Sequence, residues 1–169
     1  MSRSRGVTAA FAVMLIFGAV SAGTAAAAPP APEHCVVHVI STAPSGELLV
    51  GPASCYPTLE GAMTAEDVDA SGTGASQRVS ALATFTIGIH YDGGNFTGSS
   101  ISVVGSNCSG GWLNLSATWN NRISSTEHGC PRIRHYSGTG LTGSSQTTVA
   151  PGGNLTSLNN ITSSIQYLT

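Results

Sequence analysis

The chain has 169 residues, of which 8% are charged and 6% are aromatic. Its six basic residues are all arginines, and eight acidic residues outnumber them. So few cations exclude a nucleic-acid-binding surface, which needs clustered Lys and Arg to neutralise phosphates. They also exclude a basic face that could dock on an anionic membrane. We therefore expect no nucleic-acid partner and no membrane partner for the main body of the chain.

The N-terminus has the three parts of a secretory signal peptide. Two early arginines precede an apolar run from about Val7 to Val20, and a series of small residues follows the run. The run is too short and too rich in alanine and glycine to predict a membrane span, although an uncleaved anchor is the alternative. We expect residues 1–27 to be a signal peptide cleaved after Ala27. The chain is then a secreted, extracellular protein, and its composition is typical of a bacterial one.

The next part of the sequence predicts a small hairpin followed by a helix. Residues 28–34 form a proline-rich leader, and residues 35–68 hold the hairpin and the helix. A β-branched run, a Ser-Gly turn and a second apolar run predict the two strands. Thr58 is a suitable cap for the helix that follows. This segment is a domain of its own, an added layer on the next domain or a recognition arm, and the sequence leaves the three open.

Four cysteines remain in the exported chain, at Cys35, Cys55, Cys108 and Cys130. An even number in a secreted protein predicts two disulfides, and three pairings are possible. Nearest-neighbour pairing, 35–55 and 108–130, fits a division into an N-terminal and a C-terminal part. A zinc site is the alternative, but the C-x-x-C spacing of zinc ribbons does not occur.

After a Ser/Gly-rich linker at 69–80, residues 81–169 have the texture of an all-β domain. Short β-prone runs alternate with Gly, Ser and Asn turns, and no helical periodicity persists over three turns. The runs are 84–91, 100–104, 132–136, 146–149 and 164–168.

This half of the chain repeats itself. His90-Tyr91 and His135-Tyr136 are each followed, after four residues, by an apolar residue, Thr, Gly, Ser and Ser. The tyrosine, apolar residue and glycine predict a folded hairpin, in which the ring covers the turn and the apolar residue enters the core. Because the two histidines recur at equivalent places, we expect them to be structural.

A second repeated landmark concentrates oxygen atoms. Asn120-Asn121-Arg122-Ile123-Ser124-Ser125 recurs as Asn159-Asn160-Ile161-Thr162-Ser163-Ser164. Asn amides, Ser hydroxyls and backbone carbonyls are the hard ligands that calcium prefers, whereas zinc and copper prefer nitrogen and sulfur. The alternative is that these segments are Asx and Ser turns without an ion.

The two landmarks together resemble the βγ-crystallin superfamily. Tyr91-x4-Phe96-x-Gly98 and Tyr136-x4-Leu141-x-Gly143 are similar to its hairpin signature. The oxygen-rich segments are similar to the calcium motif of its microbial members. The resemblance covers about residues 84 to 168. It implies a βγ-crystallin-like double Greek-key sandwich, with motif one at about 84–125 and motif two at about 131–168.

The resemblance also implies two calcium sites, each clamped by oxygens from both motifs. By position, the first segment offers Asn120, Asn121, Ser124 and the Arg122 carbonyl, and the second offers Asn159, Asn160, Ser163 and the Ile161 carbonyl. Ser125 and Ser164 are expected to serve the fold. Because neither motif has an Asp, the ions lack the attraction of a carboxylate, and we expect weak binding, with dissociation constants of about 10⁻⁴ to 10⁻³ M.

These observations favour a secreted, monomeric calcium-binding module with a structural or binding role. The alternative is an inhibitor of extracellular metallopeptidases, since the chain resembles secreted actinobacterial inhibitors with the crystallin fold in size, export and paired cysteines. Attachment to cell-wall glycan is a third possibility, which the low aromatic content disfavours. We expect no enzymatic activity, because no Gly-x-Ser-x-Gly or His-Glu-x-x-His motif is present.

Overall fold

The computed structural model describes residues 31–70 and 84–169, and for residues 65–70 it describes the backbone alone. The predicted signal peptide, its cleavage site, residues 28–30 of the leader and residues 71–80 of the linker lie outside these residues. Within the described part of the chain, no helix is both long enough and apolar enough to cross a membrane.

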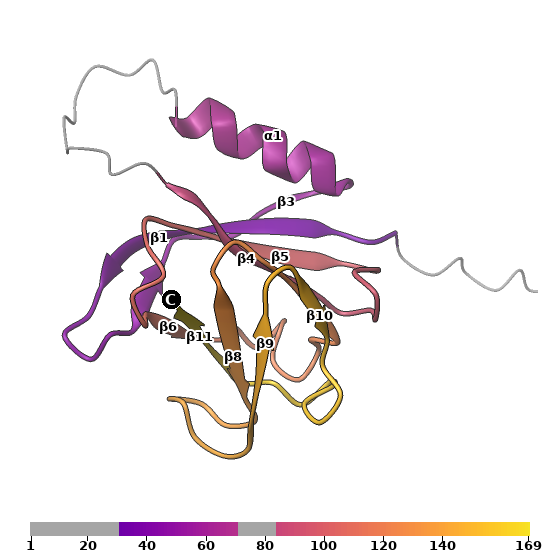
Figure 1. Cartoon of the computed structure of the whole chain (residues 1–169). Helices are drawn as coiled ribbons and strands as arrows, with labels where there is room; N and C mark the ends of the chain where they lie inside the picture. The colour runs from indigo at the N-terminus through magenta and orange to yellow at the C-terminus, as the bar shows by residue number, and fades with distance from the viewer. Residues whose placement is uncertain (1–30, 71–83) are drawn as a thin grey trace, which may run out of the picture. The chain divides into compact units, whose positions relative to one another are not determined.

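Eleven strands and one helix make up the described chain (Figure 1). They are β1 (His34–Thr42), β2 (Leu48–Val50), β3 (Ser54–Tyr56), α1 (Leu59–Ala70), β4 (Phe85–Tyr91), β5 (Ser100–Gly105), β6 (Trp112–Asn114), β7 (Ser125–His128), β8 (Arg132–Tyr136), β9 (Ser145–Val149), β10 (Gly152–Asn154) and β11 (Ser164–Leu168). The five β-prone runs of the C-terminal half are all strands. The three-residue strands β6 and β10 and the polar strand β7 were not predicted, because short or polar segments carry little periodicity.

Two sheets face each other in the C-terminal half. The first has the order β10-β7-β4-β5-β1-β2, with β3 paired to β1, and the second has the order β6-β11-β8-β9. Strands β4 to β7 form one motif and β8 to β11 form the other, and each motif places its third strand in the sheet of its partner. Thus β6 pairs with β11, and β10 pairs with β7. The predicted double Greek-key sandwich of βγ-crystallin type is confirmed.

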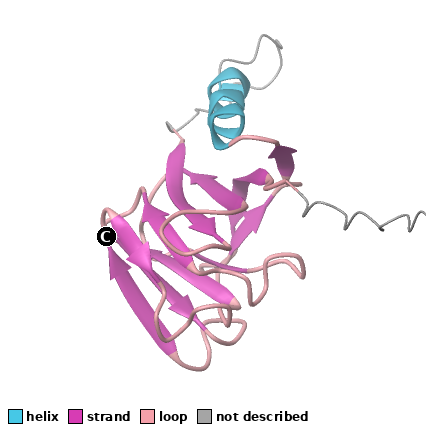
Figure 2. Ribbon diagram, turned by 90° about the vertical axis from the view of Figure 1, so that its right-hand side faces the viewer, coloured by secondary structure: helices cyan, strands magenta, loops and turns pink. Residues whose placement is uncertain are grey.

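The N-terminal segment adds strands to the first of these sheets. Strand β1 runs parallel to β5 in a register from His34↔Ser100 to His38↔Val104. Of the three roles that the sequence left open for residues 35–68, the structure shows an added layer. Helix α1 packs outside the sandwich against β1 and β3 (Figure 2), and Ala62 is buried there. The predicted cap is present, because the Gly61 N–H donates to Thr58 Oγ1 at 3.1 Å.

Both disulfides pair nearest neighbours, as predicted. Cys35 on β1 lies directly opposite Cys55 on β3 in the antiparallel register, and the two are bonded. Cys108, in the connection from β5 to β6, is bonded to Cys130, which precedes β8. The first bridge therefore closes the added layer, and the second ties a long connection of motif one to the start of motif two.

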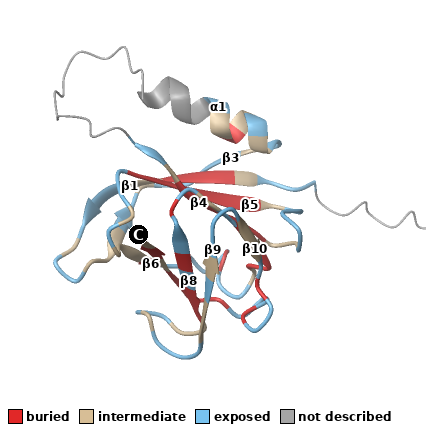
Figure 3. Cartoon of the chain, in the orientation of Figure 1, coloured by how far each residue is buried: buried red, intermediate tan, exposed pale blue. Residues whose placement is uncertain are grey.

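The core lies between the two sheets, where the inward-facing residues of successive strands are buried (Figure 3). Its largest fully buried apolar side chains are Tyr167, Ile87, Ile123, Ile133, Leu158 and Ile165. They come from both motifs, so each Greek key supplies the apolar surface that the other one covers. Burial of this kind contributes about 25 cal/mol per Å² of apolar surface.

The repeated histidines His90 and His135 are buried next to each other in this core, as expected for residues with a structural role. His90 contacts Thr126 Oγ1 and the Tyr167 hydroxyl, each at 3.0 Å, and His135 packs edge-on to it. Burial lowers the pKa of His90, and nearby histidines lower it further. Burial, followed by the charge of His128, lowers the pKa of His135 to about 3. Both rings are therefore neutral in the native protein at neutral pH.

Candidate metal centre

Each oxygen-rich segment is anchored to the hairpin of its own motif. The Ser124 N–H donates to the Tyr91 carbonyl, and the Ser163 N–H donates to the Tyr136 carbonyl, both at 2.8 Å. Tyr91 and Tyr136 are the repeated tyrosines at the ends of β4 and β8. The repeated sequence thus produces repeated geometry, with each serine held beside the first turn residue of a hairpin.

The two segments also bind each other across the boundary between the motifs. The Asn121 N–H donates to the Thr162 carbonyl at 2.8 Å, and the Asn160 N–H donates to the Ile123 carbonyl at 2.9 Å. The φ angles of Asn121 and Asn160 are 59° and 58°. Asparagine tolerates this left-handed conformation better than most residues. Each asparagine side chain consequently reaches the serine of the opposite motif.

The first oxygen cluster contains Ser124, Asn160 and the backbone of Asp92. Ser124 Oγ lies 3.0 Å from Asn160 Oδ1 and 2.8 Å from the Asp92 carbonyl oxygen. With the amide oxygen turned this way, three oxygens share the single proton of a hydroxyl. An excess of neutral oxygen acceptors from two motifs fits a hard cation such as calcium.

The second cluster is the counterpart of the first, with a longer contact between its serine and asparagine oxygens. Ser163 Oγ lies 3.5 Å from Asn121 Oδ1. Both site serines are 7% exposed, whereas Asn121 and Asn160 are exposed to solvent. The serine oxygens therefore form the floor of each cluster, and the asparagine oxygens form a rim that an ion can reach.

The remaining predicted ligands differ in their surroundings. The side chains of Asn120 and Asn159 are exposed and have no hydrogen-bond partner among the described residues. Ile161 is 45% exposed. At the position equivalent to Ile161, the Arg122 guanidinium forms an ion pair with Asp92 at 2.6 Å and lies 5.0 Å from the Trp119 ring centroid. The two clusters are thus chemically unequal, since only the first has a charged pair beside it.

Asp92 was missed by sequence reasoning, although it contributes to the first cluster in two ways. Its carbonyl faces Ser124, and its carboxylate accepts from the Ser99 N–H at 2.8 Å and pairs with Arg122. The counterpart of Asp92 in motif two is Ser137, so the pair shows no shared residue type. The usable signal was its position, directly after a repeated tyrosine.

Ser125 and Ser164 serve the hairpins, as expected. Ser125 Oγ donates to the Gly93 carbonyl at 2.7 Å and accepts from the Phe96 N–H at 3.0 Å. Ser164 Oγ makes the equivalent bonds with the Gly138 carbonyl at 2.6 Å and the Leu141 N–H at 3.1 Å. These hydroxyls tie each hairpin turn to the strand that follows the oxygen-rich segment.

The prediction that the apolar hairpin residue enters the core is wrong. Phe96 is 44% exposed and lies edge-on to the Tyr91 ring, with centroids 5.9 Å apart. Its φ is 60°, and that of Leu141 is 62°. A left-handed residue in the middle of the turn keeps its side chain on the outside of the hairpin, against the tyrosine.

A different group of ligand-type residues lies in the added layer. Ligand atoms of Glu33, Cys35 and Cys55 lie within 4.8 Å of one another. Both sulfurs are joined in a disulfide, so neither can act as the thiolate that a metal ion requires. This group is not a metal site while the bridge is intact.

Two interleaved Greek keys, with an oxygen-rich segment before the last strand of each, form a double Greek-key sandwich. The chain matches neither a protein-family profile nor a curated protein sequence. Its fold is similar to that of a βγ-crystallin domain from Clostridium beijerinckii, with 20% sequence identity, a TM-score of 0.41, and a match that covers 49% of this chain and 99% of the other. The match to a βγ-crystallin domain from Flavobacterium johnsoniae has 24% identity and a TM-score of 0.38, and it covers 49% of this chain and 94% of the other. The match to the N-terminal domain of protein S has 23% identity and a TM-score of 0.38, and it covers 48% of this chain and 94% of the other.

Proposed function

We propose that this chain is an exported protein whose double Greek-key domain binds two calcium ions. The observation that supports the proposal most is the meeting of three oxygens around Ser124, drawn from both motifs. A cluster of acceptors that share one proton gains more from a cation than from the hydrogen bond that it replaces. The symmetric placement of Ser163 and Asn121 supports a second ion.

Named by residue, the first site would use Ser124, Asn160 and the Asp92 carbonyl, and the second would use Ser163 and Asn121. Asn120, Asn159 and the carbonyls of Arg122 and Ile161 are the further oxygens of the two segments. All of these donors are neutral. The Asp92 carboxylate is balanced by Arg122, so it adds little attraction for an ion. This chemistry supports weak binding, with dissociation constants of about 10⁻⁴ to 10⁻³ M.

The proposed role of the ions is to brace the two motifs against each other. Each cluster draws its side chains from both Greek keys, so it exists only in the folded domain. A ligand that binds only the native state raises its stability by mass action. Millimolar calcium outside a cell would therefore stabilise the domain without any conformational switch.

Titration calorimetry of calcium into the metal-free chain tests this function. Two ions per chain, with a rise in the melting temperature, would support it. Ser124→Ala and Ser163→Ala should each remove one ion, whereas Ser109→Ala, at an exposed serine outside both clusters, should remove none. The absence of heat up to about 10 mM calcium, ten times the weak end of the extracellular range, would reject it.

The second candidate function is inhibition of extracellular metallopeptidases. An inhibitor requires a rigid, exposed loop that is organised before it meets its target. The connection between β5 and β6 has exposed residues at Ser106, Asn107 and Ser109, and the adjacent Cys108 is fixed to Cys130. An assay of thermolysin-type peptidase activity with the intact and the reduced protein tests this alternative. Inhibition that vanishes on reduction would favour it.

A further inference from the structure

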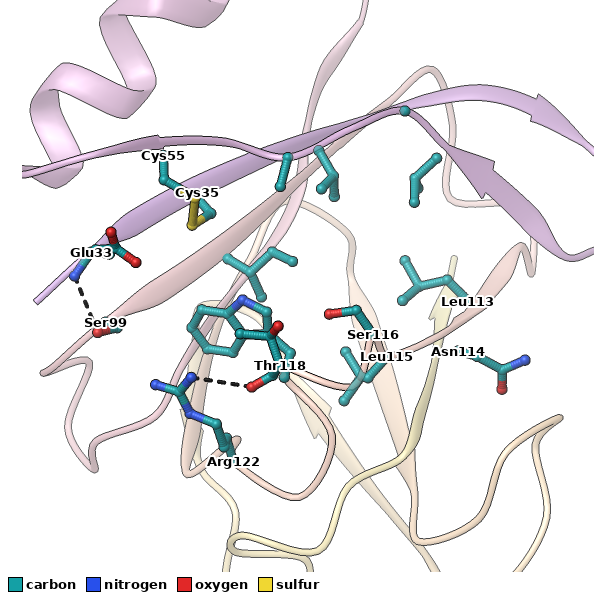
Figure 4. A pocket seen from close by; sticks show the side chains of 16 residues that line it. Glu33, Cys35, Cys55, Ser99, Leu113, Asn114, Leu115, Ser116, Thr118 and Arg122 are labelled. Carbon is teal, nitrogen blue, oxygen red and sulfur yellow. Dashed lines mark hydrogen bonds between the residues drawn. A yellow bond between two sulfur atoms is a disulfide. The ribbon is translucent and has the colours of Figure 1, made fainter.

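The added layer encloses a pocket together with the first Greek key (Figure 4). One wall comes from β1, β3 and the connection between β2 and β3, and the facing wall comes from β5, β6 and the segment that follows β6. Its volume is about 360 Å³. Pockets that bind small organic molecules range from about 300 to 1,000 Å³, so this one is large enough for a compact ligand.

The walls of the pocket are mainly apolar. Val37, Ile101 and Leu113 are buried side chains that contribute to both the core and the pocket, and the Cys35–Cys55 disulfide forms part of the upper wall in Figure 4. These side chains are held rigidly, because they belong to paired strands or to a covalent bridge. A preformed apolar cavity of this kind favours a ligand with an apolar body.

Trp119 supplies a hydrogen-bond donor to this apolar surface. The residue lines the pocket and is 5% exposed. Its indole N–H has no hydrogen-bond partner among the described residues, although its ring contacts the Arg122 guanidinium. The buried polar atoms without a partner in the described chain are His128 Nδ1 and His135 Nδ1, so the Trp119 N–H is in contact with solvent and is available to an acceptor on a bound molecule.

The charges at the mouth argue against an anionic ligand. Glu33 and Arg122 both line the pocket, on the same side in Figure 4. Arg122 is already paired with Asp92 at 2.6 Å, whereas Glu33 has no ion-pair partner among the described residues. An anion would meet one unbalanced carboxylate and no unbalanced cation. A cation would lose hydration against apolar walls, while the exposed Glu33 offers only a screened attraction in return.

We propose that this pocket binds a small, uncharged, mainly apolar organic molecule that carries one hydrogen-bond acceptor for the Trp119 indole. The pocket shares Arg122 with the surroundings of the first oxygen cluster, but its lining includes none of the clustered serines and asparagines, and the proposal does not rest on calcium binding. It exists because β1 and β3 cover one side of the first Greek key, which gives the added layer a ligand-binding role.

Prodan, a neutral naphthalene ketone whose absorption overlaps tryptophan emission, is a suitable probe. Trp112→Phe leaves Trp119 as the only tryptophan. Titration of prodan into this variant in calcium-free buffer should quench Trp119 with saturation at one dye per chain and shift the dye emission to the blue. Failure to saturate, or an equal response to the anionic dye anilinonaphthalene sulfonate, would overturn the proposal.

Variants locate the bound dye. Ala53→Phe places a ring on the upper wall, and Ser116→Phe places one on the facing wall, both from exposed lining positions. Each should weaken prodan binding by about tenfold or more, since the ring occupies the ligand volume. Leu49→Phe enlarges an exposed residue of the same hairpin that does not line the pocket, and it should change nothing. Unchanged binding in both filling variants would place the dye elsewhere and overturn the assignment.

Trp119→Phe tests the hydrogen bond, with the dye emission as the readout. The variant should weaken prodan binding but leave the binding of dimethylaminonaphthalene, which lacks the ketone, at the wild-type level. An equal loss for both dyes would show that the ring only packs, and it would contradict the role assigned to the N–H.

Discussion

Ser124 Oγ lies 3.0 Å from Asn160 Oδ1, across the boundary between the two Greek keys. The contact joins an oxygen-rich segment of one motif to that of the other, and Ser163 and Asn121 form the equivalent contact at 3.5 Å. The serines are buried and anchored to the hairpins, whereas the asparagines are exposed and left-handed. Because the serine and the asparagine of each pair differ in this way, each can be substituted on its own to test its part in the cluster.

Calcium should stabilise the domain in two separable increments. At a free concentration ten times the dissociation constant, each site adds about 1.4 kcal/mol to the free energy of unfolding. Ser124→Ala should abolish one increment and Asn121→Ala the other, because each removes an oxygen from a different cluster. Urea denaturation with and without calcium measures the increments. Two single variants that each abolish the whole calcium effect would show one shared site instead of two.

Removal of the ion-pair partner of the Asp92 carboxylate should raise the calcium affinity of the first site. Arg122→Gln removes the cation that balances Asp92, so an unpaired charge then lies beside the cluster that contains its own carbonyl. Because the Asp92 carboxylate would lie several ångströms from the ion in a solvated setting, we expect a gain in calcium affinity of roughly three- to tenfold.

Ile161→Gln is the matched control for Arg122→Gln, since it changes the equivalent position of motif two and releases no charge. Calorimetry should show a tighter ion only in the arginine variant. A gain of equal size in both variants would mean that the glutamine side chain, and not the carboxylate, provides the extra attraction.

The repeated part of this architecture was accessible from the sequence, because residues that recur must serve equivalent places. Tyr91 and Tyr136 located the two hairpins, and the paired Asn-Asn segments located the oxygen clusters. The spacing of Cys35 and Cys55 similarly indicated a local bridge. Each inference used residues that are close in sequence or related by the repeat.

The non-repeated part was not accessible. His34 pairs with Ser100, which lies far along the chain, and a β-branched run does not specify which strand edge it joins. Asp92 and Ser137 occupy equivalent places with unlike side chains, so no shared pattern marked them. The pocket beside Trp119 follows from the parallel pairing of β1 and β5, and it was therefore hidden for the same reason.

The buried histidines should make the fold sensitive to acid. Because burial lowers the pKa of His90 and His135 below the unfolded value of about 6.5, the unfolded chain binds more protons between that value and the native one. The contribution of these two histidines to the free energy of unfolding is thus fully present above about pH 6.5, and it is lost as the pH decreases below that value. Each histidine contributes a slope of up to about 1.4 kcal/mol per pH unit.

His135→Asn should flatten this slope by about one proton, even if the variant is less stable at pH 8. Urea denaturation from pH 8 to pH 4 measures the slope for both proteins. His128 is half-buried and its pKa is also lowered, chiefly by burial, so a residual slope is expected in the variant. Identical slopes in the two proteins would show that His135 does not resist protonation in the folded state.

The Cys35–Cys55 bridge should stabilise the added layer more than the double Greek-key domain. Its sequence separation is 20, and closing a loop of that length contributes about 3 kcal/mol in the chain-entropy account. In Cys35→Ala/Cys55→Ala, β3 loses its covalent link to β1, whereas the parallel ladder with β5 remains. Hydrogen exchange should accelerate in β3 and leave β8 and β11 protected.

Cys108→Ala/Cys130→Ala is the contrasting variant, since it frees a connection of the Greek keys themselves and should expose β6 first. Equal exchange throughout the chain in both variants would mean that the layer and the sandwich unfold as one unit.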